Sequence, residues 1–410
     1  MKIISYFYRI NLSYKYLIMS NIQKYISLIF LLCLIKSEHK IISIPYREAD
    51  NKLTTFLYLG YPSQDINVTL NQENDFTYFS FPDYDIKQSM TYGKKGEERV
   101  SLNGYNIQAF IVTEMIEFDC SMTMFFIDLY VYHFQNNPNK ENSHYSNSLS
   151  LSYNVKHSNY SLVNQIKHEK FIDKLSYGFH DTTKKLYFGG FPERFLIDKY
   201  EAKCKVNDKF NKYKLWGCLL KNVYIGNSER EKYIITNEYA YLTINERRIF
   251  TPEEFLVFLS NTIFKEYIER GQCKYKNSMS YKYFYCDCRY IDDFPNIIFD
   301  FNDYHFELNR SELFEEAKDN RCNFNIASNS ENQIEKVWSF GRLFILKYHT
   351  LFDYDNNEIR FYSETPFGKH NTKKYRSIQS YRKSNIISMI CSLVLLSGII
   401  VLIITLLSHK

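Results

Sequence analysis

The sequence lacks the usual marks of a nucleic-acid-binding or metal-binding protein. Its 410 residues include no basic stripe, no zinc-finger spacing and no aromatic stacking motif, and the net charge is only +5. Nucleic acid is therefore not expected as a partner. The nine cysteines form no Cys-x-x-Cys pair and no paired histidines accompany them, so neither a metal site nor another cofactor is predicted.

What the sequence does have is an aromatic-rich globular composition. Hydrophobic residues make up 45% and charged residues 24%, which is the balance of an ordinary folded protein. Aromatic residues reach 18%, with 37 Tyr and 33 Phe, and these side chains favour half-buried pleated surfaces. We therefore expect a mostly β protein, long enough for about two average domains.

An apolar run near the N-terminus predicts a signal peptide. Residues 26–35 contain no charge and follow Lys24, which matches the length and flank of a signal-peptide core and is too short to span a bilayer. We assign residues 1–37 to this segment, with cleavage near Ser37. Met19 is an alternative start.

A second apolar run predicts a membrane anchor. Residues 386–407 carry no charge and would cross the hydrocarbon core as one helix. The basic stalk before it, residues 365–385, would lie in the cytosol by the positive-inside rule alone, but a functional signal peptide overrides that rule. We predict a single-pass type I protein of the secretory pathway or cell surface, with its body lumenal or extracellular. A cytosolic, tail-anchored protein is the alternative.

Cysteines and glycosylation sequons agree with the secretory route. Seven cysteines lie between the two apolar runs, and disulfides suit a secreted chain better than metal ligation. We predict the bridges Cys204–Cys218 and Cys273–Cys286, and leave the pairing of Cys120 open. Asn-x-Ser/Thr sequons begin at Asn67, Asn159 and Asn309.

Alternating apolar and polar residues indicate strands along most of the body. Residues 53–81 read as strands around a turn at Gly60, and the same pattern occurs at 215–226 and 343–361. Residues 252–267 have apolar positions at helical spacing, and residues 311–318 predict a short helix.

Residues 60–75 (GYPSQDINVTLNQEND) resemble the Gly-x-Pro-x-Gln strand of pepsin-like aspartic proteases, which leads into the catalytic Asp-Thr-Gly loop. Residues 90–108 are similar to the flap hairpin of that family, with Tyr92 and Gly93 on its Tyr-Gly. Tyr78 stands where the family usually has Trp. The resemblance implies that these three residues line the flap and the cleft between two lobes.

The second half of the chain carries the rest of the resemblance. Residues 294–301 (FPNIIFDF) and 338–353 (WSFGRLFILKYHTLFD) are similar to late strands of the family. The family's second-lobe disulfide implies a Cys288–Cys322 bridge. The implied fold is all-β and bilobal with few short helices. Its N-terminal lobe would span residues 40–210 and its C-terminal lobe residues 211–364.

The catalytic aspartates of the family are not where the resemblance would place them. No Asp-Thr-Gly or Asp-Ser-Gly occurs in the sequence. The first loop aligns with Asn71-Gln72-Glu73, and we place the second at Thr236-Asn237-Glu238. An amide or a hydroxyl cannot act as a general base near neutral pH without a partner.

The third position of each predicted loop is a glutamate. Glu73 and Glu238 could form a substitute pair of catalytic carboxylates, or they could be exposed on relaxed loops. We favour the second interpretation, because catalysis demands precise placement of both groups.

The resulting hypothesis is a membrane-anchored aspartic-protease homologue that has lost catalysis and binds peptide or protein in its cleft. Two alternatives remain open: an active aspartic-type endopeptidase with atypical active-site residues, and a structural surface glycoprotein without a cleft ligand. Only an active endopeptidase predicts pepstatin-sensitive hydrolysis.

Overall fold

The computed structural model describes residues 40–74, 76–81, 83–102, 105–118, 123–133, 147–152, 160–206, 215–226, 232–278, 281–302, 304–329 and 337–368. The described residues from Ile41 onward belong to one compact unit. Among them, no helix is long and apolar enough to cross a membrane. The predicted signal peptide and the predicted transmembrane helix lie outside the described residues.

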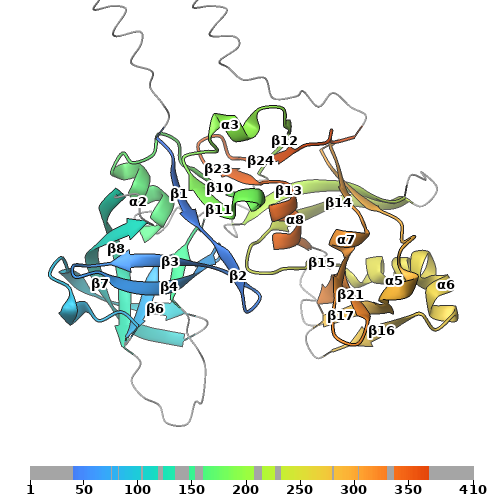
Figure 1. Cartoon of the computed structure of the whole chain (residues 1–410), viewed down its shortest axis with the longest axis horizontal. Helices are drawn as coiled ribbons and strands as arrows, with labels where there is room; N and C mark the ends of the chain where they lie inside the picture. Colours follow the sequence, from blue (N-terminus) through green and yellow to red (C-terminus); the bar gives the residue numbers. More distant parts are fainter. Residues whose placement is uncertain are drawn as a thin grey trace, which may run out of the picture. The chain divides into compact units, whose positions relative to one another are not determined.

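The first half of the chain forms an eight-stranded sheet, which we call the N-terminal sheet (Figure 1). Alternate residues of its strands are buried, as expected for a sheet with one face on a core. In spatial order its strands are β2 (Arg47–Ala49), β3 (Lys52–Leu59), β4 (Gln64–Asn71), β9 (Ser148–Ser150), β5 (Tyr78–Phe81), β8 (Thr123–His133), β7 (Tyr105–Phe118) and β6 (Gly93–Leu102).

The second half forms a ten-stranded sheet, the C-terminal sheet. Nine of its strands follow the order β16 (Cys273–Asn277), β17 (Tyr281–Asp287), β21 (Arg321–Asn329), β15 (Ile249–Thr251), β22 (Trp338–Phe340), β14 (Lys232–Leu242), β13 (Trp216–Ile225), β18 (Ile297–Phe301) and β19 (Tyr304–Leu308), while β20 (Phe314–Glu316) pairs with β21.

A six-stranded sheet, the shared sheet, draws strands from both halves of the chain. Tyr177 on β10 stacks on Phe352 of β23 at 4.9 Å between ring centroids, and Trp216 packs against the same Phe352 at 5.1 Å. These aromatic contacts join the two halves through one core. In order the strands are β1 (Ile42–Pro45), β11 (Lys185–Phe188), β10 (Ser176–His180), β23 (Leu351–Asp353), β24 (Glu358–Ser363) and β12 (Tyr200–Lys205).

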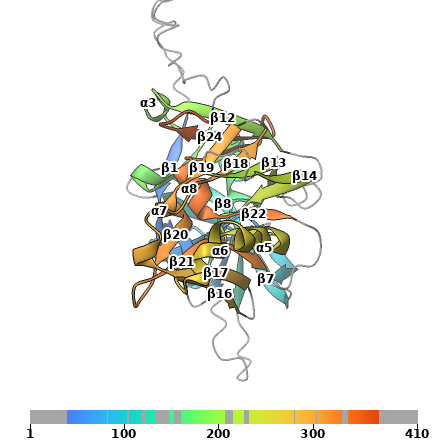
Figure 2. The same ribbon diagram turned by 90° about the vertical axis from the view of Figure 1, so that its right-hand side faces the viewer.

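The helices are few and short, as expected. Helix α5 contacts β21, and α6 contacts β16 at the edge of the C-terminal sheet (Figure 2). The α-helices are α2 (Leu162–His168), α3 (Glu193–Leu196), α5 (Glu253–Asn261), α6 (Ile263–Glu269), α7 (Arg310–Leu313) and α8 (Arg342–Lys347), and the 3-10 turns are η1 (Ile86–Gln88), η3 (Asp181–Thr183) and η5 (Cys288–Tyr290).

Most element predictions are confirmed, and two are corrected. Strands β3 and β4 flank the turn at Gly60, β13 matches the expected strand, and residues 252–267 are helical with a break at Thr262. Residues 342–347 form α8 rather than a strand. The short helix expected at 311–318 ends at Leu313, because the chain then pairs with β21 as β20. In both places tertiary contacts override the local pattern.

Within the described residues there are three disulfides, and they are the predicted pairs Cys204–Cys218, Cys273–Cys286 and Cys288–Cys322. Cys120 lies outside the described residues. Of the sequon asparagines, Asn67 is exposed on β4 and Asn309 is exposed at the start of α7, where its side chain accepts a hydrogen bond from Ser311 N. Asn159 lies outside the described residues.

Candidate active-site loops

Two loops from opposite halves of the chain meet directly. One follows β4 and comprises residues 71–74, and the other follows β14 and comprises residues 243–245. Ile244 N donates to Gln72 Oε1 at 2.8 Å, and Gln72 N donates to Asn245 Oδ1 at 3.4 Å. The buried Gln72 amide also donates to Tyr177 Oη at 2.6 Å, which ties the first loop to the shared sheet. Each loop therefore fixes the other.

The side-chain oxygen of Asn71 organises this junction. Asn71 Oδ1 accepts from Glu73 N at 2.7 Å and Asn74 N at 3.0 Å, which closes the first loop as an Asx-type turn. It also accepts from Asn245 Nδ2 at 3.3 Å on the opposite loop. The amide oxygen of Asn71 thus holds the backbone of the first loop in a turn and also binds the second loop.

Thr243 occupies the matching position of the second loop. Its side chain is buried, with Oγ1 accepting from Asn245 N at 3.2 Å and donating to Glu73 Oε1 over a long 3.5 Å. Ile244 and Gln72 are hydrogen-bonded across the junction, so we treat them as corresponding positions. The residues that precede them, Thr243 and Asn71, are then counterparts in the two loops.

This geometry corrects the predicted second loop. Thr236 lies inside β14, at an irregularity where the pairing with β13 shifts between Leu220 and Asn222. Glu238 is also a strand residue, and its carboxylate accepts from Trp338 Nε1 at 2.6 Å. The strand continues because Ala240 and Leu242 are buried in register with β13. No hydrogen bond joins Glu73 to Glu238 within the described part of the chain.

A third glutamate, Glu246, directly follows the second loop. Partial burial raises the pKa of the Glu246 carboxyl above its usual value, and the negative charge of Glu73 raises it further, while Arg342 and Arg248 act in the opposite direction. Burial also raises the pKa of Tyr241, and Glu73 and Glu246 add to that shift. The negative charge of Glu73 thus acts on the Glu246 carboxyl next to Thr243.

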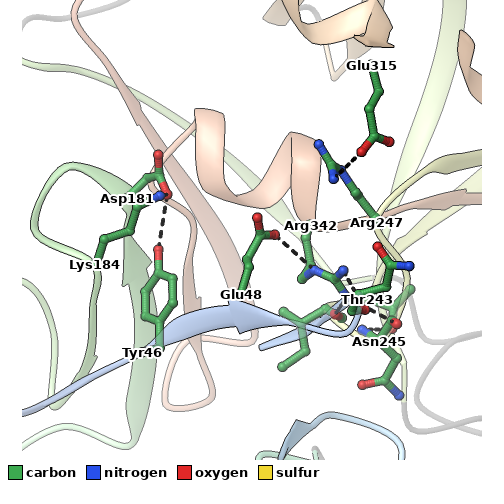
Figure 3. A network of polar contacts seen from close by, with 11 residues as sticks. Tyr46, Glu48, Asp181, Lys184, Thr243, Asn245, Arg247, Glu315 and Arg342 are labelled. Atoms are coloured by element: carbon green, nitrogen blue, oxygen red, sulfur yellow. Dashed lines mark hydrogen bonds and ion pairs between the residues drawn. The ribbon is translucent and has the colours of Figure 1, made fainter. Parts of the chain in front are cut away.

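The buried Arg342 holds the second loop in place (Figure 3), and Gly341 beside it packs against the chain that follows that loop. Arg342 on α8 is fully buried and donates to Ile244 O at 2.9 Å and to Asn51 O at 2.6 Å, so it joins the second loop to the β2–β3 turn. Gly341 packs so closely that a Cβ there would lie 2.6 Å from Glu246 O. Arg342 N donates to that same carbonyl at 2.7 Å.

The predicted flap residues do not form one group. Tyr92 packs against the main core and Gly93 begins β6, whereas Tyr78 is buried in a separate aromatic cluster. The base of the hairpin is held by Glu114, a fully buried carboxylate that accepts from Thr91 Oγ1 at 2.5 Å and from Tyr84 Oη. No motif in the sequence marks Glu114. Its only signal in the sequence is a carboxylate at a strand position where an inward-facing apolar residue is expected.

The shared sheet holds a pair of stacked histidines outside the loop junction. The rings of His180 and His349 lie 4.5 Å apart at an interplanar angle of 11°. Burial lowers the pKa of His349 to about 4, and His180 and Lys199 contribute through repulsion, while Asp181 and Glu364 oppose them. Burial lowers the pKa of His180 as well. Both imidazoles are therefore neutral in the folded protein near neutral pH.

Asn71 and Thr243, the counterparts in the two loops, carry an amide and a hydroxyl, which cannot act as general bases without a partner. The titratable carboxyls beside them are Glu73 and Glu246. Within the described residues, no group of three or more His, Cys, Asp or Glu side chains could hold a metal ion.

Comparison with known families agrees with the mostly β fold. A model of the family described as eukaryotic aspartyl protease matches residues 84–363. The chain belongs to this family. The match begins after Asn71, so the place of the first loop rests on the hydrogen bonds described above. No curated protein matches this chain.

Proposed function

We propose that this member of the eukaryotic aspartyl protease family is catalytically inactive and binds peptide or protein in an extended form. The proposal rests on one observation: the two corresponding residues of the loops are Asn71 and Thr243. Aspartic proteases need two carboxyls that share a proton and activate water. An amide and a hydroxyl at these positions remove both the base and the acid.

The loop junction also supports a binding role. Gln72 accepts from Ile244 N and donates to Asn245 Oδ1 across the junction, and Arg342 fixes the second loop to the β2–β3 turn. Loops held in this way would still offer a peptide-binding surface after catalysis is lost, because few loop residues need to become ordered when the peptide binds. The proposed location is a secretory or cell-surface membrane, with the body lumenal or extracellular and an anchor at residues 386–407.

The decisive assay uses the full-length chain in detergent with denatured casein from pH 3 to pH 7, with and without pepstatin. We expect no pepstatin-sensitive cleavage. The matched control is active pepsin under the same conditions. Cleavage by the wild type that disappears in both Glu73→Gln and Glu246→Gln would instead establish an endopeptidase that uses these two glutamates, an alternative that the effect of Glu73 on the pKa of Glu246 supports.

Binding is tested separately by hydrogen exchange of the full-length chain with an end-blocked decapeptide library. We expect slower exchange at residues 71–74 and 241–246. The control is the exposed turn at residues 270–272, where no change is expected. Unchanged exchange at the loops would contradict peptide binding and favour a structural surface glycoprotein.

A further inference from the structure

Arg248 lies shortly after the second loop and is held by aromatic rings. Its guanidinium carbon lies 4.9 Å from the ring centroid of Tyr281 and 4.9 Å from that of Tyr283. Both tyrosines come from β17, two residues apart, so they present the same face of the strand. Cation–π contact with two rings fixes the plane of the guanidinium and leaves its N–H edge available.

Within the described residues, no acidic side chain forms an ion pair with Arg248. Within the described part of the chain it makes no ion pair and no side-chain hydrogen bond, whereas neighbouring cations do: Arg247 pairs with Glu315 at 2.7 Å and Lys282 with Glu253 at 2.6 Å. The positive charge of Arg248 acts to lower the pKa of Glu246, although the two side chains form no ion pair. Lys276 adds a second positive charge 5.7 Å from the Tyr283 ring.

Strand register places this cation on the same sheet face as the loop junction. Tyr241 is paired with Ser339, Ser339 with Phe250, Phe250 with Ala327, and Ala327 with Tyr283. Residues that are directly paired on neighbouring strands share a sheet face. This row of paired residues therefore runs from Tyr241, next to the second loop, to Tyr283, which contacts Arg248. Arg248 precedes β15, and its guanidinium contacts Tyr281 and Tyr283, so it lies on the face of this row.

The row also gives the scale of the separation. Phe250 is two strand spacings from Tyr241 and Tyr283 is four, so at about 4.8 Å per strand the Arg248 guanidinium lies roughly 10–19 Å from Tyr241. An extended peptide covers that distance in about three to six residues. A ligand whose backbone passes the loop junction could therefore bring a side chain or a chain end to Arg248.

The backbone that carries Arg248 is rigid. Arg342 N and Leu343 N donate to the carbonyls of Glu246 and Arg247, and a Cβ at Gly341 would lie 2.3 Å from Arg248 O. The chain then enters β15 at Ile249. A stacked guanidinium on a fixed backbone binds a carboxylate with little loss of side-chain freedom.

We propose that Arg248, lying over Tyr281 and Tyr283, is a recognition site for a carboxylate of the bound peptide. This inference rests on the proposed peptide-binding function and names the class of ligand: an extended peptide with an acidic side chain, or with its free C-terminus, about three to six residues from the segment at the loop junction. The guanidinium edge would donate to both carboxylate oxygens, as in common Arg–carboxylate pairs.

The test measures affinities of the full-length chain for fluorescent, end-blocked decapeptides that contain a central Phe-Phe pair. One Glu is moved along the peptide, and each Glu peptide is compared with its Gln counterpart. A second arm compares free-acid with amidated C-termini in truncated peptides, which separates an acidic side chain from a chain end. We expect one position to favour the carboxylate about tenfold, and the preference to shrink as salt is added.

Variants assign the preference to Arg248. Arg248→Gln should abolish it while leaving the affinity for the Gln or amidated peptides unchanged, and Arg248→Lys should retain only part of it, because a lysine cannot bind bidentately. Arg270→Gln is the matched control, since Arg270 is exposed and already paired with Glu266.

The possible failures are distinguishable. If the peptides bind but neither arm shows a preference, or the preference survives Arg248→Gln, the carboxylate site is refuted and peptide binding stands. If no peptide binds at all, both this inference and the proposed function fail. Equal melting temperatures of wild type and Arg248→Gln exclude misfolding as the cause of a lost preference.

Discussion

Replacing Arg342 by methionine should destabilise the protein more than removal of any other ion pair described above. The side chain is 1% exposed and donates to three backbone carbonyls, those of Asn51, Ile244 and Asn245, as well as to Glu48 Oε1 at 3.3 Å. Methionine keeps most of the apolar stem but leaves these acceptors without donors. The cost therefore comes from unsatisfied carbonyls rather than from a cavity.

The magnitude follows from these contacts. Glu48 is 43% exposed, so its pairing with Arg342 is screened by solvent and contributes at most about 1 kcal/mol. Hydrogen bonds from a charged donor are stronger, and loss of one partner from a buried charged cluster typically costs about 3–5 kcal/mol. We expect Arg342→Met to lower the free energy of unfolding by that amount, measured by urea titration with tryptophan fluorescence.

Two variants serve as controls for this prediction. Glu48→Gln should cost about 1 kcal/mol or less. Arg247→Gln removes a half-exposed pair with Glu315 and should cost about as little. If Arg342→Met is also within about 1 kcal/mol of wild type, the carbonyl hydrogen bonds do not stabilise the loop junction and the reasoning is refuted.

Further predictions concern the core and the chain ends. The folded state disfavours the imidazolium form of His349, so stability should be highest above pH 6.5 and fall toward pH 4, and His349→Asn should flatten this dependence of melting temperature on pH; an unchanged slope would be contrary evidence. Reducing Cys288–Cys322, which closes a loop of 34 residues, should cost about 3–4 kcal/mol by urea titration of the double serine variant, and a loss below about 1 kcal/mol would contradict this. Gly341→Ala should cost at least about 1–3 kcal/mol, because the new Cβ meets backbone carbonyls, and an unshifted urea midpoint would refute it. Deletion of residues 386–407 should release the protein from carbonate-washed membranes, and retention would contradict the predicted anchor.

The fold could be predicted from local patterns and family resemblance. Alternation of apolar and polar residues marked β3, β4 and β13, because each strand buries one face. The turn at Gly60 was recognisable from its Gly-x-Pro sequence. The predicted cysteine pairs are the observed ones, although spacing alone permits several pairings.

The amino-acid sequence alone shows that Asn71 lies where the strand after the Gly-x-Pro turn ends, and that no Asp-Thr-Gly motif occurs. The counterpart of Asn71 in the second loop became clear only from the folded structure. The apolar pattern of β14 continues through Leu242 and contains no break that marks the loop, so Thr236 and Thr243 were not distinguishable from sequence. The decision lies in hydrogen bonds such as Ile244 N to Gln72 Oε1, which join residues 172 positions apart. Such contacts, like the rings that hold Arg248, depend on how strands pair across the whole chain, and no local pattern encodes them.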